Sequence, residues 1–137
     1  MRICLAIPSI QDFYFSRDRI SSLGALTVSR LLDDTPHTCI LFDFPKMSKK
    51  GAYVELPDEL AYLEPFLLAE TGPLSFFTRY QRLGPSHREC ARTLVAADPD
   101  MVMLSCFAYG YADNAIELAR EVKAIAPDLP IAVGGAG

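Results

Sequence analysis

Residues with hydroxyl groups and glycines follow the apolar runs of this sequence. No recognisable pair of catalytic residues stands there. Glycine lets a ligand approach the backbone closely, and a serine or tyrosine hydroxyl can hydrogen-bond a polar ligand. Neither a pair of carboxylates, nor a histidine, nor a Ser-His-Asp grouping stands at these positions. The pattern therefore predicts a binding cradle and no catalytic residue or metal ligand. The candidate cofactor-binding residues are Pro8, Ser9, Ser105, Cys106, Tyr109, Gly134 and Gly135.

The positions of these segments depend on the strands and helices that precede and follow them. Continuous apolar runs predict strands buried on both faces, and runs with a period near 3.6 predict amphipathic helices. Strands and helices alternate, which predicts a doubly wound parallel sheet, flavodoxin-like or Rossmann-like, with four or five strands. Ligands of such sheets bind at the carboxyl ends of the strands. The expected strands are 2–8, 38–44, 101–105 and 131–133, and the expected helices are 20–34, 86–97 and 115–126.

The helices have distinct signals. Ser86 and Glu89 form a capping-box pattern at the start of the second helix, in which each side chain accepts from the other residue's amide. The third helix has one apolar face and a charged face. For the first helix we expect the buried face to consist of Ile20, Leu23, Gly24, Thr27, Val28 and Leu31.

Residues 45–85 break the alternation, and we interpret them as a helical insertion after the second strand. Pro57 favours a helix start, Pro65 should kink or end that helix, and Pro73 could open another. The aromatic residues Phe76, Phe77 and Tyr80 could form the core of the insertion or a docking face. A second aromatic group after the first strand, Phe13, Tyr14 and Phe15, is expected to pack or to act as a lid.

Composition narrows the class of protein. A chain of 137 residues, half hydrophobic and 22% charged, fits one globular domain, here residues 1–137. With a net charge of −4 and no basic stripe, it is not expected to bind nucleic acid. The four cysteines (Cys4, Cys39, Cys90 and Cys106) lack metal or redox spacing and are expected to be buried thiols in a reducing compartment. The N-terminal apolar run is too short for a signal or a membrane span, so we expect a cytoplasmic protein.

Three nucleotide-binding motifs are absent. The segment after the first strand, residues 8–12, contains no glycine, so it lacks the dinucleotide fingerprint. No Gly-Lys-Ser or Gly-Lys-Thr of a phosphate-binding loop occurs. Ser105 stands where a phosphoacceptor receiver domain would need an aspartate.

The ends of the third and fourth strands resemble the N-terminal cobalamin-binding domain of radical SAM enzymes. The resemblance lies in residues 99–105 and 131–135, in Ser22-Leu23-Gly24 after a strand ending at Pro8, and in Asp43 closing the second strand. It covers nearly the whole chain through short motifs. It implies that the nucleotide tail of cobalamin enters beside Ser105 and the pair Gly134-Gly135.

The same resemblance sets limits on the chemistry. Many cobalamin domains carry Asp-x-His-x-x-Gly, in which the histidine binds cobalt, but here Asp12 is followed by Tyr14 and Arg17. The resemblance therefore implies cobalamin without a protein histidine on the metal. The cluster motif Cys-x-x-x-Cys-x-x-Cys is also absent, so S-adenosylmethionine, the 4Fe-4S cluster and the methyl transfer or other radical step would belong to a downstream radical SAM domain, which would be the partner of this one.

The end of the sequence and the aromatic insertion lead to two further expectations. Because a glycine-rich segment follows the last strand, where another helix is usual, we expect an N-terminal piece of a longer enzyme, truncated in the cofactor loop. The alternative is a non-enzymatic flavodoxin-like sensory or interaction module that docks through its aromatic insertion. The substrate, the oligomeric state and the role of the insertion cannot be read from the sequence.

Overall fold

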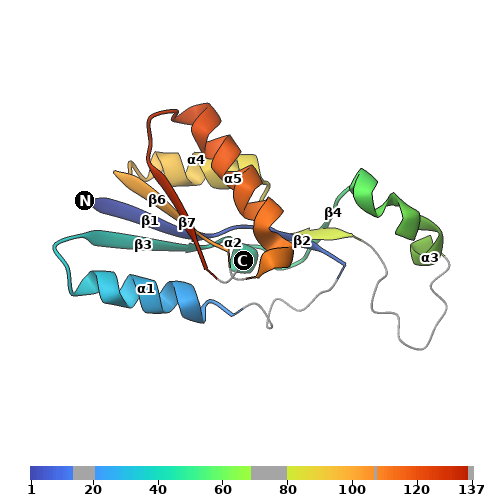
Figure 1. Ribbon diagram of the computed structural model, residues 1–137, viewed down its shortest axis with the longest axis horizontal. Helices are drawn as coiled ribbons and strands as arrows, with labels where there is room; N and C mark the ends of the chain where they lie inside the picture. Colours follow the sequence, from blue (N-terminus) through green and yellow to red (C-terminus); the bar gives the residue numbers. More distant parts are fainter. Residues whose placement is uncertain (14–20, 69–79, 107, 136–137) are drawn as a thin grey trace.

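The computed structural model describes residues 1–13, 21–68, 80–106 and 108–135. Its centre is a four-stranded parallel sheet of β1 (Arg2–Ile7), β3 (Thr38–Asp43), β6 (Met101–Ser105) and β7 (Ile131–Gly134). The strand order is β3-β1-β6-β7, so the chain reverses its direction of winding between β1 and β6. The predicted α/β architecture with a parallel sheet is confirmed, and Figure 1 shows the four strands side by side.

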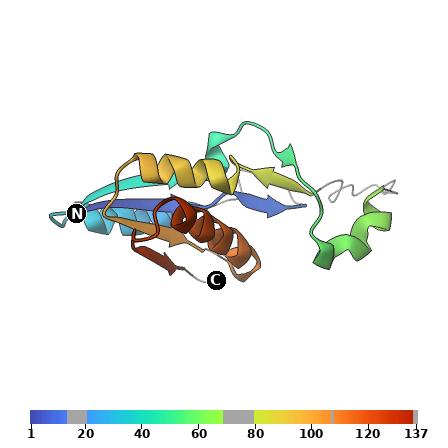
Figure 2. The same ribbon diagram turned by 90° about the horizontal axis from the view of Figure 1, so that it is seen from above.

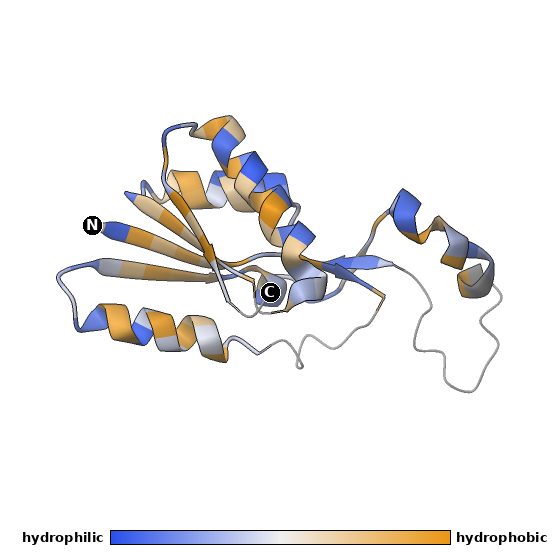
Figure 3. Cartoon of the chain, viewed as in Figure 1, coloured by the Kyte–Doolittle hydropathy of each residue, from blue (hydrophilic) through white to orange (hydrophobic). Residues whose placement is uncertain are grey.

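Helices cover both faces of this sheet. Helix α1 (Leu23–Asp33) lies against β1 and β3 on one face. Helices α4 (His87–Ala96) and α5 (Ala112–Ile125) pack together on the other face (Figure 1). Figure 3 shows apolar residues along the strands and mixed polarity on the helices, as expected for a sheet buried between two layers.

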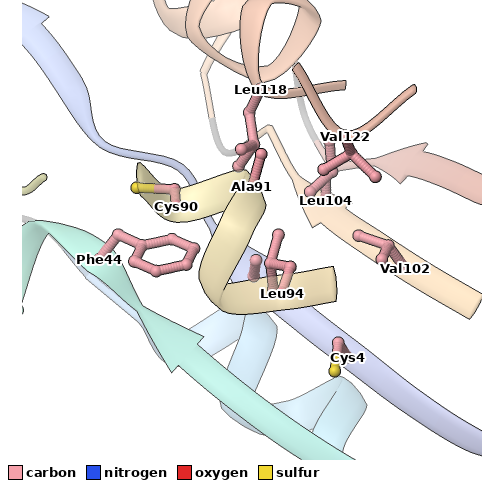
Figure 4. Packing of buried hydrophobic residues seen from close by; sticks show 10 residues of the cluster. Cys4, Phe44, Cys90, Ala91, Leu94, Val102, Leu104, Leu118 and Val122 are labelled. Atoms are coloured by element: carbon pink, nitrogen blue, oxygen red, sulfur yellow. The ribbon is translucent and has the colours of Figure 1, made fainter. Parts of the chain in front are cut away.

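The main core lies between the sheet and α4 with α5. Leu94 and Cys90 of α4 are fully buried against Phe44 and the inner strands, and Leu118 and Val122 of α5 close the cluster. Figure 4 shows these side chains gathered around α4. The capping box predicted at Ser86 and Glu89 is present.

The insertion differs from the prediction because it is not purely helical. After β3 come α2 (Phe44–Met47), β4 (Ala52–Tyr53), the 3-10 helix η2 (Asp58–Leu63), α3 (Glu64–Leu68) and β5 (Gln81–Leu83). Strands β4 and β5 form an antiparallel sheet with β2 (Ile10–Asp12), in the order β2-β5-β4. These three strands have two or three residues each, too few for a period to be detected. Pro65 lies where η2 passes into α3.

The insertion extends the molecule beyond the carboxyl edge of the main sheet. Figures 1 and 2 show η2 and α3 projecting at the end remote from the amino end of β1. Tyr53 and Tyr62 are exposed on it. The predicted helix at Pro73, with Phe76 and Phe77, lies outside the described residues, as do Tyr14 and Phe15.

The buried face of α1 also differs from the prediction. Ala25 is buried against the sheet, whereas Leu23 is 70% exposed and Leu31 is also exposed. The helix has more than one apolar stripe, and Ala25 and Val28 pack against Leu5 and Ile7. Gly24 faces a groove instead, and Ile20 lies outside the described residues.

Candidate functional site

A groove of about 430 Å³ runs across the face of the sheet that carries α1. Helix α1 lies over β1 and β3, and the groove begins where its cover ends. Leu5 and Met103 occupy matching positions on β1 and β6, and Ala132 continues the row on β7. The groove therefore crosses the point between β1 and β6 at which the winding reverses, the usual ligand position in this architecture. Its lining residues are Leu5, Gly24, Ala25, Val28, Met103, Leu104, Ser105, Ala132, Val133, Gly134 and Gly135.

Three predicted site residues meet at the carboxyl end of this groove. Ser105 ends β6 and is paired in register with Gly134, which ends β7. Gly135 follows directly. The hydroxyl of Ser105 forms no hydrogen bond with any described residue, so it can donate to or accept from a ligand in the groove.

Gly135 is fixed by the backbone beside it. Its φ is +136°, a conformation that residues with a side chain rarely adopt, and a Cβ there would lie 1.9 Å from the carbonyl oxygen of Cys106. The amide of Cys106 also donates to the carbonyl of Gly134, at 2.8 Å. The segments after β6 and β7 are thereby locked together, and this sets the position of Ser105 next to the glycines.

At Gly24 and Gly134 the described structure has room for a side chain, so packing does not explain why these residues are glycine. No heavy atom lies within 4 Å of a Cβ built on either residue, and both line the groove. A glycine in the first turn of a helix costs stability relative to alanine, about 0.5–1 kcal/mol. Open space at both positions is what close approach of a ligand to the backbone would need.

Pro8 and Ser9 are not part of the groove. Ser9 is fully buried, and its Oγ lies 3.3 Å from the Sγ of Cys90. Gly84, with φ +105°, packs directly on it, since a Cβ at Gly84 would lie 2.3 Å from the Ser9 Oγ. Burial raises the pKa of the Cys90 thiol, so this pair is packing within the core.

The side chains of Cys106 and Tyr109 do not lie together, because Cys106 is buried and Tyr109 is exposed. Cys106 is buried, and its Sγ lies 3.5 Å from the carbonyl oxygen of Ala108. Tyr109 begins the 3-10 helix η3 (Tyr109–Tyr111) and is 85% exposed outside the groove. The cysteine contributes its backbone to the site, through the contacts with Gly134 and Gly135.

A polar cluster at the start of α1 was not singled out as a site from the sequence. Ser22 donates to Asp43, and Lys46 forms an ion pair with the same carboxylate at 2.9 Å. Lys46 also donates to the Ser22 Oγ. Because Asp43 ends β3, the cluster ties that strand to the first turn of α1 and so positions Gly24 beside the groove.

Asp12, which stands where the resemblance would have the first residue of the motif Asp-x-His-x-x-Gly, has a structural partner. Its Oδ2 accepts from the hydroxyl of Tyr111 at 2.6 Å. Burial raises the pKa of Tyr111 to about 12, with further contributions from the hydrogen bond and charge of Asp12. Asp12 therefore connects β2 to the segment that leads from β6 into α5.

The two histidines of the chain lie away from the groove. His87 is buried at the first turn of α4, on the opposite face of the sheet, and its Nδ1 lies 2.8 Å from Glu117. His37 precedes β3, at the opposite edge from Ser105. In the described part of the chain no three His, Cys, Asp or Glu side chains are grouped to hold a metal ion.

A second hollow, of about 500 Å³, lies beyond the carboxyl edge, between η2 and α5. Tyr80, Asp113 and Glu117 are among its lining residues. Burial raises the pKa of Tyr80, and nearby carboxylates raise it further. The Asn114 side chain, which accepts from the Gln11 amide at 3.1 Å, forms part of its wall.

Comparison with known proteins identifies no relative: no family model, curated protein or solved structure matches the chain. Within the described ranges, none of the helices has the length and apolar character to cross a membrane.

Proposed function

We propose that this chain is the cobalamin-binding module of a radical SAM enzyme. The observation that carries the proposal is the groove in which Ser105, Gly24 and Gly134 meet. It is mostly apolar, it crosses the switch point of the sheet, and its glycines leave open space at the backbone. The sequence resemblance implies that the nucleotide tail of cobalamin would lie beside Ser105, Gly134 and Gly135.

The residues present fit such a tail. A flat aromatic base needs apolar walls, which Leu5, Val28 and Met103 provide. The sugar and phosphate of the tail need hydrogen-bonding groups at the carboxyl end of the groove, where the Ser105 hydroxyl lies without a hydrogen bond to any described residue. Gly134 has open space at its Cβ position, so a tail can approach the backbone there, while Gly135 is held against the backbone of Cys106.

The role of this chain would be to bind and orient. When bound, cobalamin would supply a cobalt centre that takes up and gives away a methyl group. Ser105 and the glycines would hold the tail, and the remoteness of His37 and His87 favours a form without protein histidine on the cobalt. S-adenosylmethionine and the 4Fe-4S cluster would be held by a separate radical SAM domain.

The test uses hydroxocobalamin added to the purified chain, followed by desalting and a visible spectrum. We expect retained cobalamin with a shifted spectrum. Gly24→Leu should fill the groove and abolish retention while the helix remains folded, since leucine is a better helix former than glycine. Gly110→Leu is the matched control, because Gly110 also has open space at its Cβ but lies outside the groove. A colourless wild-type protein with intact circular dichroism contradicts the proposal.

A second candidate is a protein-interaction module that uses the insertion. The exposed Tyr53 and Tyr62 on the projecting segment favour it. This function predicts no retention of cobalamin and a rise in melting temperature only when a protein partner is added. Replacing both tyrosines by serine should abolish that rise and leave cobalamin retention unchanged.

A further inference from the structure

A third hollow, lined by residues of β5, α4 and α5, brings three arginines together in an acidic protein. Its volume is about 380 Å³, and it is separate from the groove on the α1 face. Arginines from three different elements line it: Arg82 of β5, Arg88 of α4 and Arg120 of α5. The chain as a whole has a net charge of −4, so this hollow is a local reversal of sign.

No described residue forms an ion pair with any of these three arginines. In the part of the chain that the structure describes, Arg88 and Arg120 have no hydrogen-bond or ion-pair partner. The Nε of Arg82 donates to the carbonyl oxygen of Gly84 at 3.4 Å, and the terminal nitrogens of its guanidinium group have no acceptor among the described residues. A guanidinium group presents several N–H donors in a fixed plane, the geometry that suits phosphate and carboxylate oxygens.

The buried wall of the hollow is formed by His87 of α4. The ring of His87 lies between two groups that can only accept: the carbonyl oxygen of Ser9 at 3.1 Å from Nε2, and the carboxylate of Glu117 at 2.8 Å from Nδ1. Glu117 is thus turned toward the His87 ring, and the lining as a whole holds three arginines against two carboxylates, those of Glu117 and Glu121.

The first turn of α4 contributes two backbone donors. The capping box uses the amides of Ser86 and Glu89, whereas the amides of His87 and Arg88 have no acceptor among the described residues. The helix has ten residues, and the partial positive charge of its N-terminus favours an anion.

From these observations we infer that the hollow is a binding site for a small phosphorylated compound, held through its phosphate dianion. The arginine side chains would pair with the phosphate oxygens, and the remaining space would take the organic part. This site does not depend on cobalamin, since it lies on the other face of the sheet.

The inference is tested by titrating ¹⁵N-labelled protein with glycerol phosphate and, separately, with inorganic phosphate, at constant ionic strength adjusted with sodium chloride. We expect saturable shifts of the His87 and Arg88 amides with both probes. Arg120→Gln should weaken binding about fivefold, since an exposed charge pair contributes little more than that. Glu121→Gln, which removes one of the two carboxylates of the lining, should strengthen binding.

The matched control is Arg92→Gln, because Arg92 is an exposed arginine on the same helix but does not line the hollow. It should bind both probes like the wild type. Equal weakening by Arg92→Gln and Arg120→Gln would show a diffuse charge effect and overturn the site. Absence of saturable shifts overturns it as well, and binding of inorganic phosphate without glycerol phosphate overturns the assignment to a phosphorylated compound. Circular dichroism melts of each variant separate these results from unfolding.

Discussion

Gly135 and Cys106 are in backbone contact: the carbonyl oxygen of Cys106 occupies the space into which any side chain at Gly135 would point, 1.9 Å from a Cβ. The contact joins the segments that follow β6 and β7. It also explains why only one of the two adjacent glycines is required by the fold, since Gly134 has open space around it.

Gly135→Ala is therefore expected to lower the free energy of unfolding by about 2 kcal/mol or more, because the residue must leave both its φ and its position. Gly134→Ala should change this free energy by less than about 0.5 kcal/mol. Urea denaturation of the two variants measures both values. Equal losses would mean that the contact with Cys106 does not distinguish the two glycines.

A substitution at Gly24 tests whether the glycine that keeps the groove open lowers the free energy of unfolding. An alanine there meets no atom within 4 Å and removes the conformational freedom of glycine, so Gly24→Ala should raise the free energy of unfolding by about 0.5–1 kcal/mol. Thermal denaturation without ligand measures the gain. A loss of stability in Gly24→Ala would show that the space beside α1 is closed in solution.

Strands with long apolar runs were predictable from the sequence, because burial on both faces leaves an unmistakable pattern in β1 and β6. The small sheet was not, since Gln11, Gln81 and Arg82 are polar and their pairing is decided by contacts far apart in the chain. These residues look like loop residues until β2, β4 and β5 are brought together.

The sequence predicted the site residues whose positions are set by the ends of strands. It did not predict those whose exposure is decided by packing against distant residues. Ser105, Gly134 and Gly135 meet because parallel strands end at one edge. Ser9 follows a strand in the same way, but Gly84 and Cys90 cover it, and they come from a distant part of the sequence. Gly24 was expected to be buried within the packed face of α1, whereas Ala25 lies there, because a helix with several apolar stripes does not specify which one meets the sheet.

The capping box of α4 should make stability depend on pH in the acid range. Hydrogen bonds from Ser86 lower the pKa of Glu89 below its ordinary value of 4.5. A lowered pKa in the folded state means that the contribution is complete above about pH 4.5 and is lost as the pH falls through the folded value. Ser86→Ala should cost about 1 kcal/mol at pH 7 through the lost cap.

Glu89→Gln should flatten the pH dependence of stability below pH 4.5, and Glu55→Gln provides the control. Glu55 is exposed and has no hydrogen-bond partner among the described residues. Denaturation at a series of pH values compares the two. If both variants have the same slope as the wild type, the capping box does not carry the effect.

The hydrogen bond between Tyr111 and Asp12 predicts a late phenol titration at alkaline pH. Burial and Asp12 raise the pKa of Tyr111 from 10.0 to about 12, so the neutral phenol stabilises the fold below pH 10 and this contribution is lost as the pH rises toward 12. Absorbance at alkaline pH should show Tyr111 titrating near pH 12, after the exposed tyrosines, and Tyr111→Phe should reduce the late phase, to which Tyr80 also contributes. Asp12→Asn should lower the pKa of Tyr111, because the amide still accepts the hydrogen bond but no longer repels the phenolate. Tyr109→Phe is the control, since it removes an exposed phenol and should leave the late phase intact. A late phase whose amplitude is the same in Tyr111→Phe as in the wild type contradicts the assignment.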